Sequence, residues 1–371
     1  MKKIGLLTLN YQVNYGGILQ LISLYQYLKF LGYDVEVINY KSFQKNSIIR
    51  KILLKITNLL WGGSFWNSIK DKIVEKKIPR EKNSLELINR NKIYLDCNLK
   101  FTEEVNETSI EDIGKNYDVI IVGSDQIWSV TDANKLIYLF DWNYSGEKIA
   151  YAACSVKTKP SYLNKRKVKF LLKKFDKITV RDKTTYDFVY NSSKIKPTFV
   201  CDPTMLINHK DFIGAPMLND EYIFVYILGD EIKGSHTSLL EKIKGEIGNY
   251  KIVSSVIPNN SIVATKGADL VFDTCTPLEW LNLLYYAKFV VTDSYHGALF
   301  SIHYNKDFVA YYKSYKRATR LLDLASQYNL KKNFISNINE LSNIEYPIKY
   351  EYINEISERL VLNSQSVLQK L

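Results

Sequence analysis

The chain has 371 residues, of which 46% are hydrophobic and 24% are charged, a composition typical of soluble globular proteins. At roughly 150 residues per domain, this length predicts about two domains, each able to bury a core. The four cysteines form no Cys-x-x-Cys pair, which argues against a zinc knuckle or a disulfide framework and favours a cytoplasmic location. The apolar start ends at Asn10, too early for a signal peptide, and no stretch approaches the ~20 apolar residues of a membrane span.

The formal net charge of +11 favours an anionic partner. Much of the excess falls in residues 43–82, where ten basic and three acidic residues accompany apolar residues at helical spacing. This segment is interpreted as a basic amphipathic insert that makes peripheral contact with the inner membrane face, or else as a solvated helix packed on its own domain. Nucleic acid is not expected as a partner, because no recognisable binding module occurs.

Strand and helix patterns alternate along the chain. The predicted strands cover residues 4–9, 35–39, 118–122, 148–153, 177–180, 198–200, 222–228, 251–256, 270–272 and 289–292. The predicted helices cover residues 18–30, 237–247, 278–287 and 351–371. This alternation predicts an α/β fold with two Rossmann-like, doubly wound domains. The expected boundaries are 1–205 for the first domain, on the acceptor side, 206–345 for the second, on the donor side, and 346–371 for a C-terminal helix.

The most informative motif follows the predicted strand at 289–292. It reads Asp293-Ser294-Tyr295-His296-Gly297, and a helix is expected to begin near Gly297. In an open α/β sheet this strand end borders the binding crevice, and the N–H groups of the following helix suit a phosphate or carboxylate. His296 is therefore a candidate acid or base, although a lone histidine is often structural. His209, His236 and His303 have no comparable setting.

Two other glycine-bearing loops are candidate binding elements. Asn14-Tyr15-Gly16-Gly17 precedes a helix and permits close approach of a ligand to the backbone, but it is not a GxGxxG motif. Gly123-Ser124-Asp125-Gln126-Ile127-Trp128 follows a strand. Its small residues, carboxylate and indole fit a sugar held by stacking and hydrogen bonds, or equally a helix cap with Trp128 in the core.

Several cations are candidates for binding an anionic substrate. Lys313, Lys316, Arg317 and Arg320 form a cluster before a predicted helix, and Arg181 directly follows the strand at 177–180. Arginine suits fork-like recognition of carboxylate and phosphate. The alternative for the cluster is a solvated helix start, and the alternatives for Arg181 are an ion pair with Asp182 or a cap on a neighbouring helix.

In chain order, six segments resemble the polysaccharide pyruvyl transferase family. They are residues 14–20, Val122-Gly-Ser-Asp-Gln-Ile-Trp128, Lys148-Ile-Ala-Tyr-Ala-Ala153, Val180-Arg-Asp182, Asp202-Pro-Thr204 and Val291-Thr-Asp-Ser-Tyr-His-Gly297. The resemblance implies a GT-B-like arrangement of the two domains, with the C-terminal helix crossing back to the first. It also implies phosphoenolpyruvate as co-substrate, a sugar or polyprenyl-linked glycan as acceptor, and a pyruvate ketal on a surface glycan as product.

The same resemblance assigns expected roles to individual residues. His296 matches the proposed catalytic histidine, and Arg181 and Arg320 fall where arginines are common in the family. Several relatives carry arginine two positions before the histidine, where this chain has Ser294. Asp125 and Asp293 are candidates to activate acceptor hydroxyls, and no step requires a metal or a redox cofactor. Two alternatives stay open: a GT-B glycosyltransferase that uses a nucleotide sugar, and a non-catalytic anion- or glycan-binding protein.

Overall fold

A computed structural model describes residues 1–9, 13–42, 82–129, 136–229, 231–257, 262–313 and 318–371. Nearly all of the predicted basic insert at 43–82 lies outside these ranges, and so does Arg317. Within them, no helix combines the length and the apolar character needed to cross a membrane.

The first half of the chain folds around a parallel six-stranded sheet, in the order β2-β1-β3-β4-β5-β6. The strands are β1 (Lys3–Leu7), β2 (Asp34–Val37), β3 (Val119–Val122), β4 (Glu147–Ala153), β5 (Lys177–Val180) and β6 (Thr198–Phe199). The helices are α1 (Tyr15–Phe30), α4 (Lys82–Asn98), α5 (Ile110–Gly114), α6 (Lys165–Leu172) and α7 (Lys183–Ser193). All four residues of β3 are buried, as expected for a central parallel strand that helices cover on both faces.

The second half contains another parallel six-stranded sheet, in the order β12-β11-β10-β7-β8-β9. Its strands are β7 (Tyr222–Tyr226), β8 (Lys251–Ser255), β9 (Leu270–Phe272), β10 (Phe289–Thr292), β11 (Phe308–Tyr311) and β12 (Phe334–Ile335). Its helices are α8 (Lys210–Ile213), α9 (His236–Ile247), α10 (Pro277–Tyr285), α11 (Tyr295–His303) and α12 (Thr319–Gln327). The fold class of two Rossmann-like domains is confirmed, and β11 and β12 are additional to the predicted strands.

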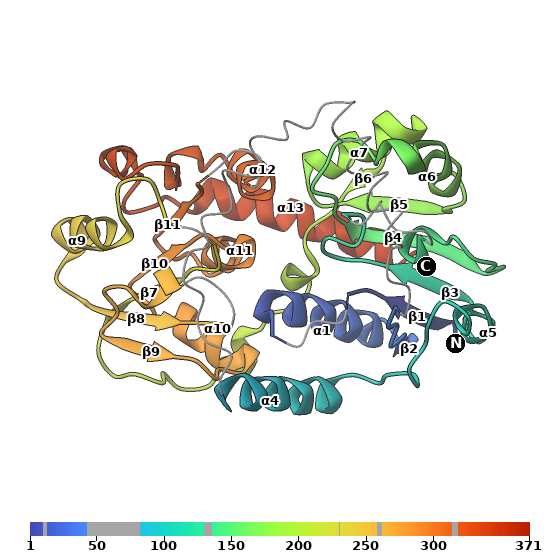
Figure 1. The fold of residues 1–371 in the computed structure, drawn as a ribbon, viewed down its shortest axis with the longest axis horizontal. Helices are drawn as coiled ribbons and strands as arrows, with labels where there is room; N and C mark the ends of the chain where they lie inside the picture. The colour runs from blue at the N-terminus through green and yellow to red at the C-terminus, as the bar shows by residue number, and fades with distance from the viewer. Residues whose placement is uncertain (10–12, 43–81, 130–135, 230, 258–261, 314–317) are drawn as a thin grey trace.

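Helix α13 (Glu351–Leu368) connects the two halves (Figure 1). Near its start, the Tyr350 hydroxyl donates to the Lys306 carbonyl at 2.5 Å in the second half. Near its end, the Ser364 hydroxyl accepts from the Cys201 N–H at 2.8 Å, and the Tyr33 hydroxyl donates to the Leu371 carbonyl at 3.1 Å. The last helix therefore begins against the second domain and ends against the first.

The strand order reverses between β1 and β3 in the first sheet and between β7 and β10 in the second. Such reversal points leave a crevice beyond the carboxyl ends of the strands, where α/β proteins bind ligands. At the reversal point of the second sheet, the Asp293 carboxylate holds the segment after β7. It accepts the N–H groups of Leu228 and Gly229, each at 2.7 Å. The two sheets lie on either side of the space between the two domains (Figure 1).

Candidate functional site between the two domains

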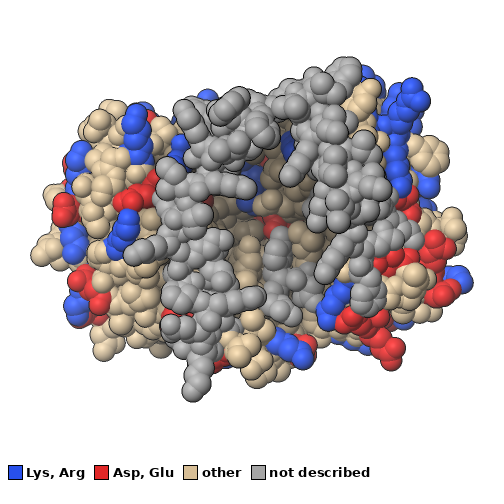
Figure 2. Space-filling view, viewed as in Figure 1, with Lys and Arg blue, Asp and Glu red and all other residues tan. Residues whose placement is uncertain are grey.

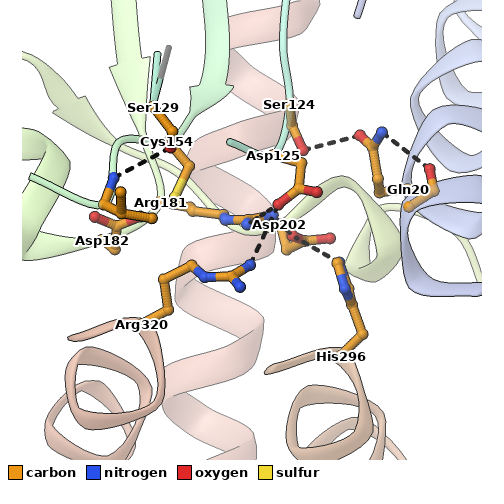
Figure 3. Close-up of polar contacts among 12 residues, drawn as sticks. Gln20, Ser124, Asp125, Ser129, Cys154, Arg181, Asp182, Asp202, His296 and Arg320 are labelled. Atoms are coloured by element: carbon orange, nitrogen blue, oxygen red, sulfur yellow. Dashed lines mark hydrogen bonds and ion pairs between the residues drawn. The ribbon is translucent and has the colours of Figure 1, made fainter. Parts of the chain in front are cut away.

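Side chains from five strand and helix ends meet between the domains (Figure 3). Asp125, Arg181 and Asp202 follow β3, β5 and β6 of the first sheet. His296 lies in the first turn of α11, and Arg320 lies near the start of α12. Figure 2 shows a hollow at the centre of this face, with atoms of basic and acidic side chains visible inside it. The five residues are far apart in sequence and are brought together by the arrangement of the two sheets.

Arg181 occupies the centre of this group and is only 2% exposed. Its Nη2 donates to Oδ1 of Asp125 at 2.8 Å, and its Nη1 donates to Oδ2 of Asp202. Burial lowers the pKa of a guanidinium, but the neighbouring carboxylates and the Tyr295 hydroxyl raise it, and the net pKa of Arg181 is raised. Arg181 was expected to bind substrate. The structure places it in a buried double ion pair with Asp125 and Asp202, two partners that the sequence did not predict.

His296 is held at the N-terminus of α11 by local features of the sequence. The Ser294 hydroxyl caps the helix by accepting the Gly297 N–H at 3.3 Å. A Cβ at position 297 would lie 2.4 Å from Oγ1 of Thr292, so only glycine fits where the chain turns from β10 into the helix. Ser294 and Gly297 therefore shape the turn that presents His296. The His296 side chain is 6% exposed, and its Nε2 lies 3.7 Å from Oδ2 of Asp202.

The opposite wall of the histidine site is the first turn of α1. The Asn14 side chain caps this helix by accepting the Gly17 N–H at 3.0 Å. A Cβ at Gly16 would lie 2.2 Å from Cγ of His296, so the backbone of α1 approaches the imidazole more closely than any other residue type permits. The loop was predicted to let a ligand approach its backbone closely. In the structure, the group that approaches the backbone is the side chain of His296 from the other domain.

Asp202 belongs to the site but was not among the predicted site residues. Its Oδ1 accepts the backbone N–H of Thr204 at 3.0 Å and the Thr204 hydroxyl at 2.8 Å. Burial raises the pKa of this carboxyl, but Arg181, His296 and the Thr204 N–H outweigh burial and lower it well below the usual range. The available signal was the motif Asp202-Pro203-Thr204 directly after a strand, which resembles an Asp-capped turn.

Arg320 is the more accessible of the two arginines, with 26% of its side chain exposed. Its Nη1 lies 3.4 Å from Oδ1 of Asp125, and its guanidinium lies 5.6 Å from the centre of the Tyr295 ring. With the Gln126 amide turned so that its oxygen faces Arg320, that oxygen accepts from Nη2 at 2.6 Å and from Nη1 at 2.9 Å. Arg320 therefore reaches across from the second domain to the loop after β3 of the first.

The remaining predicted site residues have other surroundings. Trp128 is 1% exposed, and its indole N–H donates to the Tyr138 carbonyl at 2.9 Å, so the proposed stacking on a sugar is wrong and Trp128 belongs to the core. The buried Ser124 hydroxyl donates to Oε1 of Gln20 at 2.9 Å. Asp293 uses both carboxylate oxygens to hold the end of β7, and its role in activating a hydroxyl stays a prediction. Lys313 lines a pocket together with Glu231 and Lys233, and His296 is not among the described residues that line it.

The charges of the central group nearly cancel, because Arg181 and Arg320 face Asp125 and Asp202. Buried ion pairs persist when each charge keeps its partner, and this network meets that condition. In the described residues, no three His, Cys, Asp or Glu side chains are grouped as metal ligands would be. The chemistry that these side chains offer is proton transfer by His296 and anion binding by Arg320.

Comparison with solved structures places the fold. The UDP-GlcNAc 2-epimerase from Neisseria meningitidis, bound to UDP-GlcNAc, superimposes with a TM-score of 0.52 at 10% identity, covering 100% of this chain and 99% of that one. Arabidopsis thaliana UGT89C1 complexed with UDP-L-rhamnose gives a TM-score of 0.51 at 9% identity, covering 100% and 98%. At these identities the similarity concerns the fold alone, and it supports a GT-B-like arrangement of the two domains.

Sequence comparison gives a more specific result. Among curated proteins, no significant match to this chain is found. The family model for polysaccharide pyruvyl transferase matches residues 14–315, which include the Asn14 cap, the loop after β3, Arg181, Asp202 and the His296 turn. The match covers well over half of the 371 residues and includes four of the five residues assembled between the domains, all but Arg320, so this chain belongs to the polysaccharide pyruvyl transferase family.

Proposed function

We propose that this protein transfers the three-carbon skeleton of phosphoenolpyruvate to two hydroxyls of one sugar, forming a pyruvate ketal and releasing phosphate. The acceptor is a sugar of a surface glycan or of its lipid-linked precursor. Family membership supports a transferase acting on a glycan. The observation that carries the proposal is the position of His296, in the first turn of a helix at the switch point of the second sheet, beside a buried carboxylate.

The proposed reaction needs a proton donor, an anion-binding group and an acceptor. Protonation of C3 of the enol makes C2 electrophilic, and a positioned general acid contributes about 10²- to 10⁴-fold to such a step. One sugar hydroxyl adds to C2, the C2–O bond to phosphate breaks, and the second hydroxyl then closes the ketal. One hydroxyl proton leaves with phosphate, and the other restores the proton given to C3. His296 is the proposed acid, and Arg320 is the proposed contact for the carboxylate or phosphate of the donor.

The test is release of inorganic phosphate from phosphoenolpyruvate in the presence of candidate glycans. Phosphate release should depend on the acceptor and be lost in His296→Ala. The matched control is His303→Ala, at the other end of the same helix, which should retain turnover because His303 lies away from the group between the domains. Equal activity of the two variants would contradict the assignment of His296, and no release with a broad set of acceptors would contradict the proposed donor.

Nucleotide sugars provide a comparison within the same test, because the two structural relatives were solved with UDP-sugars. A ligand that binds only the folded protein raises its unfolding temperature. Phosphoenolpyruvate should therefore stabilise the protein, and UDP and GDP should not. The opposite result would favour a glycosyltransferase that uses a nucleotide sugar, and stabilisation by glycans without turnover would favour a binding protein.

A contact with the inner membrane face is a separate part of the proposal. It rests on the ten basic residues in the sequence segment 43–82, nearly all of which lies outside the described residues. Sedimentation with vesicles that contain anionic lipid should recover the protein at low salt but not at high salt. Equal recovery with neutral vesicles would contradict an electrostatic contact.

A further inference from the structure

The imidazole of His296 is oriented by two contacts. Its Nε2 points toward Oδ2 of Asp202 at 3.7 Å, and it is buried without a hydrogen bond to any described residue. The edge formed by Cγ and Nδ1 faces Gly16, where a Cβ would lie 2.2 and 2.3 Å from those two atoms. The ring therefore turns Nε2 toward a carboxylate, and its Nδ1 lies beside the backbone of Gly16, where there is no room for a residue with a side chain.

Asp202 cannot turn away from the histidine, because both carboxylate oxygens are occupied. Oδ1 accepts from the Thr204 N–H and hydroxyl, and Oδ2 accepts from Nη1 of Arg181. Paired with a guanidinium, the carboxylate is ionised at neutral pH and can only accept hydrogen bonds. A nitrogen that faces such an acceptor keeps its proton, and this fixes the tautomer of a neutral imidazole. The 3.7 Å separation suits a contact that shortens when substrate binds.

We propose that Asp202 is a positioning residue that holds the proton of neutral His296 on Nε2 and leaves Nδ1 as the nitrogen that exchanges a proton with the substrate. The role of Nδ1 in catalysis rests on the proposed function, because that function supplies the reaction. In that step the imidazolium gives its Nδ1 proton to C3, the C2–C3 π electrons form the new C–H bond, and Nε2–H remains directed at Asp202. An acceptor hydroxyl then returns a proton to Nδ1.

Nitrogen-15 NMR of histidine-labelled protein tests the tautomer without substrate. The chain has four histidines, and the spectrum of His296→Ala identifies the signals of His296. Burial lowers the pKa of His209 to about 3 and the pKa values of His236 and His303 to about 4, so these three are neutral in neutral buffer. We expect the neutral form of wild-type His296 to carry its proton on Nε2. In Asp202→Asn, an amide that can donate to Nε2 should shift the proton toward Nδ1.

Asp125→Asn is the matched control, because it also removes one carboxylate partner of Arg181 but does not face His296. It should leave the tautomer unchanged. A proton on Nδ1 in the wild type, a wild-type tautomer in Asp202→Asn, or the same change in both variants would overturn the inference. If Asp202→Asn does not fold, Thr204→Val removes one hydrogen bond to Oδ1 with little change of shape, and it should shift the tautomer partially in the same direction.

Kinetics provide the second readout. Asp202→Asn should lower kcat by about 10²- to 10⁴-fold with little change in KM for phosphoenolpyruvate, because proton transfer is affected and Arg320 is not. A purely structural role would raise KM and lower kcat together while leaving the tautomer unchanged, and this pattern would overturn the inference. Wild-type protein with the expected tautomer but no turnover of phosphoenolpyruvate would contradict the proposed function and still support positioning by Asp202.

Discussion

The contact between Gly16 and His296 gives the sharpest prediction, because it joins the two domains at the site. In Gly16→Ala, the new Cβ would lie 2.2 Å from Cγ, 2.3 Å from Nδ1 and 2.4 Å from Cβ of His296. Ordinary carbon–carbon contacts are about 3.5–4.0 Å. The three short distances all involve the rigid base of a buried side chain rather than a flexible end, so either the imidazole or helix α1 must move by more than 1 Å.

Overpacking of this kind destabilises a protein by about 1–3 kcal/mol, and the higher helix propensity of alanine offsets at most about 1 kcal/mol of that. We therefore expect a net loss of about 1–2 kcal/mol in the free energy of unfolding. The effect on activity should be larger, because a displacement of about 1 Å at a reacting group costs on the order of 10²-fold in rate. The expected result is a hundredfold lower kcat in a folded protein.

The assay combines phosphate release with urea unfolding, and Gly245→Ala is the control. Gly245 lies inside helix α9, and a Cβ there meets nothing within 4 Å. This variant should keep its activity and gain about 0.4–1 kcal/mol of stability. The reasoning would be refuted if Gly16→Ala behaved like Gly245→Ala, because α1 would then not approach His296 as closely as these distances require.

Three further predictions follow from the charges of the site and of the core. Arg320→Gln should raise KM for phosphoenolpyruvate and change stability by less than about 1 kcal/mol, as measured by kinetics and urea unfolding, because its ion pair is partly exposed. Arg181→Met should destabilise the fold by about 3–5 kcal/mol in the same unfolding assay, since two buried aspartates lose their partner. Acidification should destabilise the wild type between about pH 6.5 and pH 4. Burial lowers the pKa of His209 to about 3 and the pKa of His236 to about 4, so in this range both bind protons on unfolding. Each of these two histidines should lower the free energy of unfolding by about 2 kcal/mol by pH 5. Replacing His236 with Gln should reduce that loss, and an unchanged pH dependence of stability would count against this account.

Much of the fold followed from local patterns in the sequence. The apolar strand at 119–122 is buried along its whole length, and the alternation of strands and helices predicted two parallel sheets. Strands β11 and β12 were not predicted, although strands as short as these were predicted at 198–200 and 289–292. β11 pairs with β10 and β12 pairs with β11, so both strands depend on the rest of the sheet being in place.

The site was less predictable, because its central contacts join distant parts of the chain. Arg181 pairs with aspartates 56 and 21 residues away, and no local pattern shows which carboxylate a strand-end arginine will meet. The sequence allowed Trp128 to be a stacking platform for a sugar or part of the core, and its burial together with its bond to the Tyr138 carbonyl decides in favour of the core. The chemistry-bearing turn at His296 was predictable because its strand, cap and glycine are adjacent in sequence.

The resemblance to the family led to the expectation of an arginine two residues before His296, where this chain has Ser294. Here Ser294 caps helix α11, a role that the longer arginine side chain does not fill. Cations are instead supplied by other elements: the guanidinium groups of Arg181 and Arg320 lie 4.5 and 5.6 Å from the centre of the Tyr295 ring. Asp125 and Asp202 balance the charge of Arg181, and the part-exposed Arg320 can exchange its 3.4 Å contact with Asp125 for a substrate anion. Anion binding at this end of α11 should therefore depend more on Arg320 than on Arg181, which instead determines whether the carboxylate facing His296 stays in place.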